Sequence, residues 1–184
     1  MNPLPLHREG LGLWLNEAGL TGTMAEIGCA HGGFSKIMLN SWKGQKYIMV
    51  DPWVHQDEKV YKERQEEAWK YLRWFEECSE IAGSDKRVVM MRFLSHNAVQ
   101  FVDDGSLDCC YIDGNHSLEA VSEDLVDWWP KVKPGGLFCG HDFYDATHDG
   151  HWCQVYTAVM DWANKNKLPV LTTLCSSWWI RKPI

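Results

Sequence analysis

The sequence predicts a doubly wound α/β fold. We expect a mostly parallel sheet of seven strands, with an antiparallel closing strand and helices on both faces. Two observations lead to this prediction. Short apolar runs alternate with segments of helical period along the chain. The run LDCCYID at 107–113 has a nearly continuous apolar centre, which is typical of a parallel strand that is buried on both faces.

The predicted elements follow from the apolar period and from the residues that end each run. The long charged helix at 57–83 is expected to stop at Gly83, and Ser117 is expected to cap the helix that follows it. Pro134 to Gly136 are interpreted as a turn. Strands are expected at 24–27, 46–51, 87–93, 107–113, 137–142, 169–174 and 177–182, and helices at 11–20, 34–42, 57–83, 97–102, 117–132 and 155–166.

The chain has 184 residues, and no internal repeat, low-complexity tract or linker divides it. This length suits one domain with a sizeable core, so we expect a single domain over 1–184. The formal net charge of -7 argues against a broad nucleic-acid surface or an anionic membrane as the main partner.

The sequence also predicts the compartment. No segment approaches ~18 consecutive apolar residues, and the first ten residues, MNPLPLHREG, lack the apolar centre of a secretory signal. None of the seven cysteines forms a CxxC pair. We therefore expect reduced cysteines and a cytoplasmic protein.

A glycine-rich loop joins the first predicted strand, at 24–27, to the helix that follows it, in AEIGCAHGGFS at 25–35. Gly28 and Gly33 match the outer positions of the dinucleotide pattern GxGxxG, but Ala30 replaces the middle glycine. The P-loop pattern GxxxxGK[ST] fails as well, because Phe34 stands in place of its lysine. The loop therefore favours a ligand without phosphates.

Two acids accompany the loop. Glu26 precedes Gly28, and Asp51 ends the second predicted strand. An acid roughly 20 residues after such a loop accepts hydrogen bonds from ribose hydroxyls. The pattern predicts a nucleoside ligand with a zwitterionic or cationic tail, and S-adenosylmethionine fits.

With these residues the chain resembles a class I S-adenosylmethionine-dependent methyltransferase over roughly residues 20–145. The resemblance rests on EIGCAHGGFS, on VDPW at 50–53, and on a block at 105–143 that contains IDGNH, PGG and GHD in order. The order IDGxH, PGG and HD resembles a small-molecule O-methyltransferase subgroup. The resemblance implies a Rossmann-like fold, and methyl transfer to a small hydroxylated molecule such as a sugar or natural product.

The resemblance also implies roles for individual residues. Asp51 would hold the ribose hydroxyls, Pro52 and Trp53 would lie against the adenine, and Asp113 would lie beneath the sulfonium and the acceptor. The implied cofactor-binding residues are Glu26, Gly28, Cys29, Ala30, His31, Gly32, Gly33, Asp51, Pro52, Trp53, Ser95, His96, Asn97 and Asp113.

A metal site is predicted at the ends of two neighbouring strands. Adjacent strands lie ~4.8 Å apart, so Asp113 and Asp142 can share one cation, with His141 beside them. Oxygen ligands favour Mg²⁺, and an added histidine nitrogen favours Mn²⁺, Fe²⁺ or Zn²⁺. Asn115 stands where resembling sugar methyltransferases carry a second acid, so His116 is the candidate base. The candidate catalytic residues are Asp113, His116 and His141.

Other interpretations remain open. A cephalosporin-hydroxylase-type enzyme would use His116, His141 and Asp142 as an iron site, and a noncatalytic cofactor-binding module is a third possibility. His148 and His151 are expected in a mobile polar loop over the acceptor pocket, or in the metal site. The core fold leaves little chain for a separate acceptor domain, so a homodimer is plausible.

Overall fold

The computed structural model describes residues 5, 7–56, 65–148, 151–173 and 175–184. Its main sheet has seven strands in the order β3-β2-β1-β4-β5-β9-β8. The first five strands in this order are parallel, and β9 runs antiparallel to both β5 and β8. The predicted sheet with its antiparallel closing strand is therefore confirmed. The strands are β1 Thr23–Ile27, β2 Lys46–Val50, β3 Val88–Met91, β4 Leu107–Ile112, β5 Val132–Gly140, β8 Leu171–Thr172 and β9 Trp178–Arg181.

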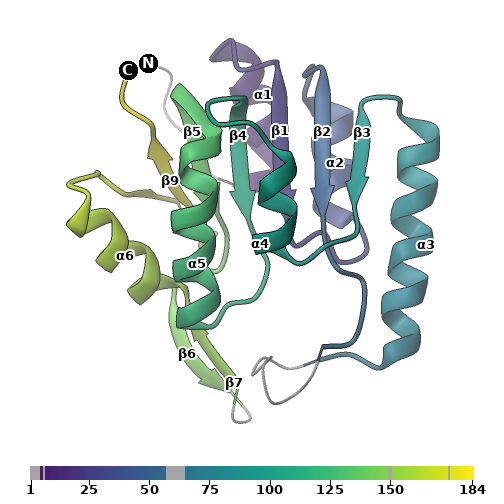
Figure 1. Cartoon of the computed structure of the whole chain (residues 1–184). Helices are drawn as coiled ribbons and strands as arrows, with labels where there is room; N and C mark the ends of the chain where they lie inside the picture. The colour runs from purple at the N-terminus through teal and green to yellow at the C-terminus, as the bar shows by residue number, and fades with distance from the viewer. Residues whose placement is uncertain (1–4, 6, 57–64, 149–150, 174) are drawn as a thin grey trace.

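Helices cover both faces of the sheet, as predicted. Figure 1 shows α4, α5 and α6 in front of the sheet and α1 and α2 behind it. Buried residues of α1, α2 and α3 belong to one apolar cluster, and those of α4, α5 and α6 belong to the other. The helices are α1 Leu11–Glu17, α2 Gly33–Ser41, α3 Ala68–Ser84, α4 Ser95–Ala98, α5 Leu118–Trp128 and α6 Val155–Lys165, with short 3-10 turns at Arg8–Gly10, Val99–Phe101 and Trp129–Lys131.

The central strand β4 explains why the two layers form. All six of its residues are buried. Successive side chains of a strand point to opposite faces. Cys109 and Tyr111 pack with α1, α2 and α3, whereas Cys110 and Ile112 pack with α4, α5 and α6. The continuous apolar run thus supplies both cores from one strand.

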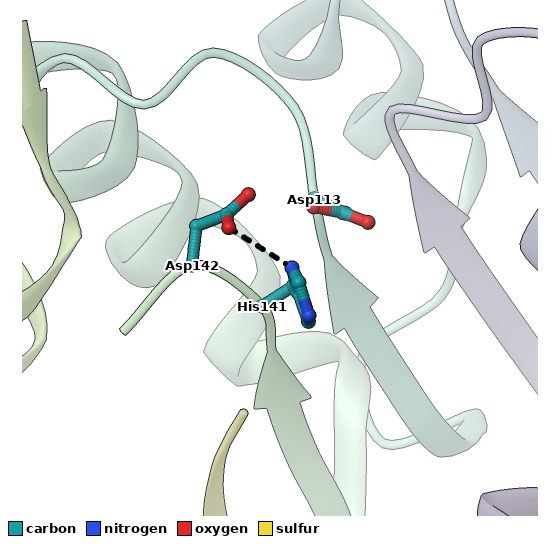
Figure 2. A group of neighbouring side chains, drawn as sticks. All are labelled: Asp113, His141 and Asp142. Carbon is teal, nitrogen blue, oxygen red and sulfur yellow. Dashed lines mark ion pairs between the residues drawn. The ribbon is translucent and has the colours of Figure 1, made fainter. Parts of the chain in front are cut away.

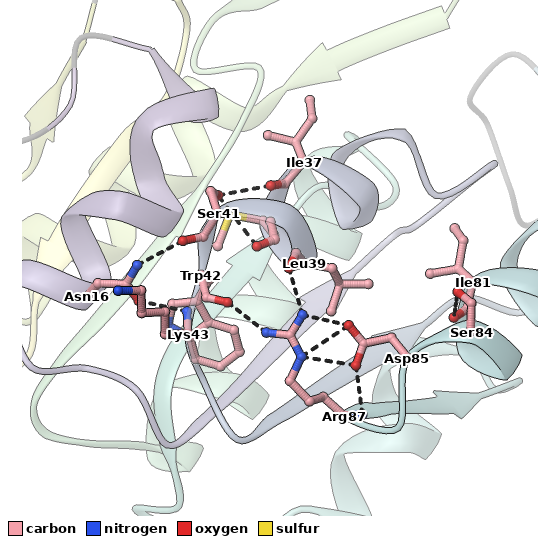
Figure 3. Close-up of polar contacts among 11 residues, drawn as sticks. Asn16, Ile37, Leu39, Ser41, Trp42, Lys43, Ile81, Ser84, Asp85 and Arg87 are labelled. Atoms are coloured by element: carbon pink, nitrogen blue, oxygen red, sulfur yellow. Dashed lines mark hydrogen bonds and ion pairs between the residues drawn. The ribbon is translucent and has the colours of Figure 1, made fainter.

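Arg87, which precedes the edge strand β3, forms hydrogen bonds with the end of α2 (Figure 3). Its guanidinium donates to the carbonyl oxygens of Leu39 at 2.6 Å and Trp42 at 2.7 Å, and it pairs with Asp85 at 2.6 Å. The last carbonyls of a helix have no partner within the helix, and a cation near them is favourable. Arg87 therefore closes the C-terminal end of α2.

Several predicted boundaries are wrong. Helix α3 begins at Ala68 instead of residue 57, and residues 65–67 are not helical; the part of the prediction at 57–64 lies outside the described residues. The predicted turn at 134–136 lies within β5, where a left-handed Gly135 keeps the chain paired to Lys182. The Ser117 cap is confirmed, because its hydroxyl accepts a hydrogen bond from the Ala120 amide at 3.3 Å.

The expectation of a loop around His148 and His151 is also wrong. The strands β6 Asp145–His148 and β7 His151–Gln154 form an antiparallel hairpin. In Figure 1 this hairpin lies below the arrowhead end of β4, at the edge where the parallel strands end. The side chains of His148 and His151 lie outside the described residues.

All seven cysteines are free thiols, as expected. Within the described ranges, each helix is too short or too polar to cross a bilayer.

Candidate active site

Strand register brings the predicted acids together at one edge of the sheet. Ile112 pairs with Ile27 on one side and with Gly140 on the other. The Asp113 amide then donates to the Ile27 carbonyl at 2.7 Å, and the His141 amide donates to the Ile112 carbonyl at 3.1 Å. The residues that follow β1, β4 and β5 are therefore neighbours, which is where ligands bind in sheets of this kind.

Asp51 holds the glycine loop in place. One of its carboxylate oxygens accepts hydrogen bonds from the amides of Cys29 and Ala30, both at 3.0 Å, and the other accepts from the Trp53 amide at 2.7 Å. Burial raises the pKa of Asp51, and these three hydrogen bonds oppose the rise. The carboxylate thus joins the end of β2 to the turn after β1, whose residues Gly28, Ala30 and Gly32 have left-handed φ angles.

A cleft of about 730 Å³ opens beside this loop. This volume falls within the usual range of small-molecule sites. Several of the predicted cofactor residues line it. They are Gly28, Ala30, Asp51, Pro52, Ser95, His96 and Asp113.

The other predicted cofactor residues, all of them described, do not line the cleft: Glu26, Cys29, His31, Gly32, Gly33, Trp53 and Asn97. Trp53 has a positive φ angle of 42°, and its ring turns into the loop, where Nε1 donates to the Ala30 carbonyl at 2.7 Å. Pro52 alone of the pair therefore faces the cleft.

Glu26 is a buried acid beneath the loop. Its side chain accepts hydrogen bonds from the hydroxyls of Ser35 and, at 2.7 Å, Tyr47. Burial raises the pKa of Glu26 to about 7, although both hydrogen bonds act in the opposite direction. In this position Glu26 supports the start of α2 rather than reaching a ligand.

The acids and histidines at the ends of β4 and β5 form a cluster. Figure 2 shows Asp113 after β4, with His141 and Asp142 after β5. One ligand atom from each of these three residues lies within 4.8 Å of the others. His116 Nε2 lies 3.0 Å from Asp142 and 3.7 Å from Asp113. The structure thus brings together all four predicted catalytic and metal-ligating residues.

Two histidines stabilise the ionised form of Asp142. Burial of Asp142 would raise its pKa, but hydrogen bonds from His116 and His141 outweigh burial and hold the pKa well below its usual range. Asp142 is therefore an anion between two imidazoles. Its left-handed φ of 51° turns the chain sharply at this point.

Sequence reasoning missed Arg8. Its guanidinium lies 3.0 Å from Asp113 and 5.4 Å from the centre of the Phe34 ring. Arg8 belongs to the short turn before α1, with no motif around it, so the sequence offers no signal that would bring it to the end of β4. It places a permanent positive charge on one of the candidate metal ligands.

Asp124 was missed as well. It is 4% exposed, lines the cleft, and accepts a hydrogen bond from the Ser95 hydroxyl. Burial raises its pKa to about 7, the Ser95 bond lowers it, and the nearby charges of Glu123 and Asp127 raise it further. A signal was present, because Asp124 follows Val121 by three and precedes Trp128 by four, on the apolar face of α5.

The chain is similar to known methyltransferases in sequence pattern and in fold. A family model described as a methyltransferase domain matches residues 25–143, which is more than half of the chain and includes the glycine loop, Asp51, Asp113 and Asp142. The chain belongs to the methyltransferase domain family. A search of curated proteins found no match.

Solved structures of methyltransferases share the fold at low sequence identity. The O-methyltransferase NovP is 14% identical, with a TM-score of 0.69 over 97% of this chain and 79% of that chain. An inferred O-methyltransferase from Klebsiella pneumoniae is 14% identical, with a TM-score of 0.68 over 100% of this chain and 82% of that chain. The 1,6-didemethyltoxoflavin-N1-methyltransferase of Burkholderia thailandensis, solved with S-adenosylhomocysteine, is 12% identical, with a TM-score of 0.61 over 96% and 77% of the two chains. The resemblance to class I S-adenosylmethionine-dependent methyltransferases is confirmed by the family match and the shared fold.

Proposed function

We propose that this methyltransferase moves the methyl group of S-adenosylmethionine to a hydroxyl of a small molecule, such as a sugar or another polyhydroxylated natural product, with the help of a divalent cation. One observation carries the proposal. Asp113 lines the cleft and also belongs to the cluster with His116, His141 and Asp142. A cofactor in the cleft would therefore present its methyl end to the acids and histidines.

The cleft suits the cofactor. A carboxylate offers about four acceptor positions, and three backbone amides occupy Asp51. One acceptor position thus remains for a ribose hydroxyl. The walls beyond Asp51 include apolar residues, and Val50, Pro52, Leu94 and Ala120 would enclose a flat base.

The donor set also suits a divalent cation. Asp113 and Asp142 supply oxygen, His141 supplies nitrogen, and their atoms lie close enough to share one ion. A cation bound there would lower the pKa of a chelated acceptor hydroxyl. The proposed ligands are Asp113, His141 and Asp142.

A side chain of the protein would accept the proton of the acceptor hydroxyl. His116 is placed to take the hydroxyl proton, because Asp142 at 3.0 Å stabilises the resulting imidazolium. The deprotonated oxygen then attacks the methyl carbon. The new C–O bond forms as the C–S bond breaks, which leaves a neutral thioether and a protonated His116 that returns its proton to water.

The β6–β7 hairpin favours a small acceptor. The Gln154 amide donates to the His116 carbonyl at 2.8 Å, so the hairpin is fixed beside the cluster. Tyr144 and Trp152 are 43% and 52% exposed, so this segment carries accessible aromatic surface, and burial and then the nearby charge of Asp142 raise the pKa of Tyr144. Such surface suits the apolar face of a sugar or a phenolic ring.

Calorimetry tests the cofactor and metal assignments separately. Metal-stripped protein is titrated with S-adenosylmethionine, with and without Mg²⁺. We expect Asp51→Ala to lose cofactor binding, and the exposed Asp103→Ala to keep it. We expect a separate Mg²⁺ heat that disappears in Asp142→Ala. Folded wild-type protein that binds no cofactor at millimolar concentration would refute the proposal, and bound iron with oxygen consumption would instead favour the hydroxylase.

A further inference from the structure

Asp124 is a buried acid whose side chain forms part of the cleft wall without belonging to the reaction centre. It lies on α5 between Val121 and Trp128, which are both buried in the core. Its own exposure is 4%, yet it lines the cleft together with Ser95 and Ala120. An acid in such a position needs hydrogen-bond donors around it.

The direction of the hydrogen bonds around Asp124 is fixed. Trp128 Nε1 can only donate, and it donates to the Ser95 hydroxyl oxygen at 2.8 Å. Ser95 in turn donates its own proton to one carboxylate oxygen of Asp124. Asp124 is therefore the acceptor at the end of a chain that starts in the core.

Among the described residues, none donates a hydrogen bond to the second carboxylate oxygen of Asp124. Within the part of the chain that the structure describes, Ser95 is the single hydrogen-bond partner of the Asp124 side chain. The second oxygen, Oδ2, lies on the side of Gly114, where a Cβ added to that glycine would be 4.0 Å away. Gly114 also lines the cleft, so this oxygen is available to a ligand there.

The position of Asp124 in the cleft limits which group of the cofactor could donate a hydrogen bond to it. With the methyl end of the cofactor at Asp113 and the ribose at Asp51, the base would lie toward Pro52, Leu94 and Ser95, which all line the cleft. The only hydrogen-bond donor on the ring of a 9-substituted adenine is the exocyclic 6-amino group. We infer that Asp124 accepts a hydrogen bond from this 6-amino group, and that Asp124 makes the cleft specific for adenine over 6-oxopurines. This inference rests on the proposed function.

Above its pKa of about 7 the Asp124 side chain is ionised and can only accept, so a 6-oxopurine in the same position would place an acceptor against an acceptor. The loss of one hydrogen bond at a buried, fixed acceptor lowers affinity by about tenfold to a hundredfold. Asp124→Asn changes this preference, because its amide oxygen can keep the Ser95 bond while its NH₂ group faces the cleft. That NH₂ group donates to a 6-oxo group and opposes a 6-amino group.

The test compares S-adenosylhomocysteine with S-inosylhomocysteine by calorimetry at about pH 8.5, above the pKa of Asp124, so that its carboxylate is ionised. We expect the wild-type protein to prefer the adenine compound by at least about tenfold. We expect Asp124→Asn to reduce the preference to less than about threefold or to reverse it. The control is Asp127→Asn, which removes a carboxylate one turn along α5 and outside the cleft lining, and it should keep the wild-type preference.

The outcomes separate this inference from the proposed function. Equal binding of both compounds by wild-type protein would overturn the role of Asp124 and leave the cofactor assignment intact, even if Asp124→Asn does not fold. An Asp124→Asn variant that keeps the full preference would overturn it as well. Wild-type protein that binds neither compound would remove the cofactor assignment and this inference together.

Discussion

Gly28 and Asp113 are in direct contact across the edge of the sheet. A Cβ added to Gly28 would lie 2.2 Å from the Asp113 carbonyl oxygen and 2.5 Å from Gly114 Cα. The absence of a side chain at Gly28 therefore lets the ends of β1 and β4 approach each other. The same contact sets the position of the carboxylate that joins the cleft to the acid and histidine cluster.

This contact predicts the effect of Gly28→Ala. A methyl group there meets the backbone, which cannot yield, and Gly28 also has a left-handed φ of 88°. We expect cofactor affinity to fall by more than about a hundredfold and stability to fall by at least about 2 kcal/mol. Calorimetric binding and thermal unfolding measure the two effects.

Gly105→Ala is the matched control. Gly105 has a similar φ of 67°, but a Cβ there meets nothing within 4 Å. It should lose about 1 kcal/mol of stability and no cofactor affinity. Equal losses of cofactor affinity and stability in the two variants would contradict a role for the close approach at Gly28.

Glu26 makes stability depend on pH. Its folded-state pKa of about 7 lies above the usual 4.5, so the folded state binds more protons between these values. Stability should therefore fall as the pH rises from about 4.5 to about 7, and stay lower above it. Glu26→Gln keeps an acceptor for Ser35 and Tyr47 but cannot ionise. The fall in the free energy of unfolding between these pH values should therefore be smaller in the variant, by roughly 3 kcal/mol or less. Urea unfolding across pH 4.5 to 8, with the exposed Glu80→Gln as control, should reveal the difference; parallel curves for all three proteins would contradict it.

Arg87 should matter for stability and not for binding. Arg87→Gln removes charged donors from the Leu39 and Trp42 carbonyls at the end of α2 and breaks the pair with Asp85. We expect a loss of about 2 kcal/mol in the free energy of unfolding. Lys86→Gln, an exposed neighbour with the same charge change, should cost less than about 0.5 kcal/mol. Equal losses would mean that the three contacts contribute little.

Arg8 should compete with a cation for Asp113. Its guanidinium lies 3.0 Å from a carboxylate oxygen of Asp113 and must move or share that oxygen when an ion binds. Arg8→Gln should therefore bind Mn²⁺ more tightly, by roughly threefold to tenfold. Titration followed by the Mn²⁺ paramagnetic resonance signal measures this affinity, with Lys43→Gln as the control. Unchanged or weaker binding in Arg8→Gln would contradict the competition.

Much of the fold and part of the site were predictable. The apolar runs of β1, β2 and β4 locate those strands to within one residue, because a buried parallel strand needs such a run. The acids Asp51 and Asp113 then fall at the strand ends by topology alone. Asp142 follows in the same way, since β5 is the neighbour of β4.

The remainder depends on contacts that the sequence does not encode locally. Trp53 has the right position for a ligand contact, but a positive φ and a bond to Ala30 turn its ring away. Arg8 reaches Asp113 from a segment without a motif. The β6–β7 hairpin has no apolar alternation in DATHDGHW, and it is held in part by the backbone bond from Gln154 to His116.

Methyl transfer itself is the most direct test of the proposed function. Purified protein is incubated with methyl-labelled S-adenosylmethionine and a panel of sugars and catechols, with Mg²⁺ or with a chelator. We predict label in at least one hydroxylated acceptor, a requirement for the divalent cation, and loss of transfer by a hundredfold or more in Asp142→Ala. Folded protein that binds the cofactor but labels no acceptor, or transfer that persists at full rate in chelator and in Asp142→Ala, would contradict cation-assisted O-methylation.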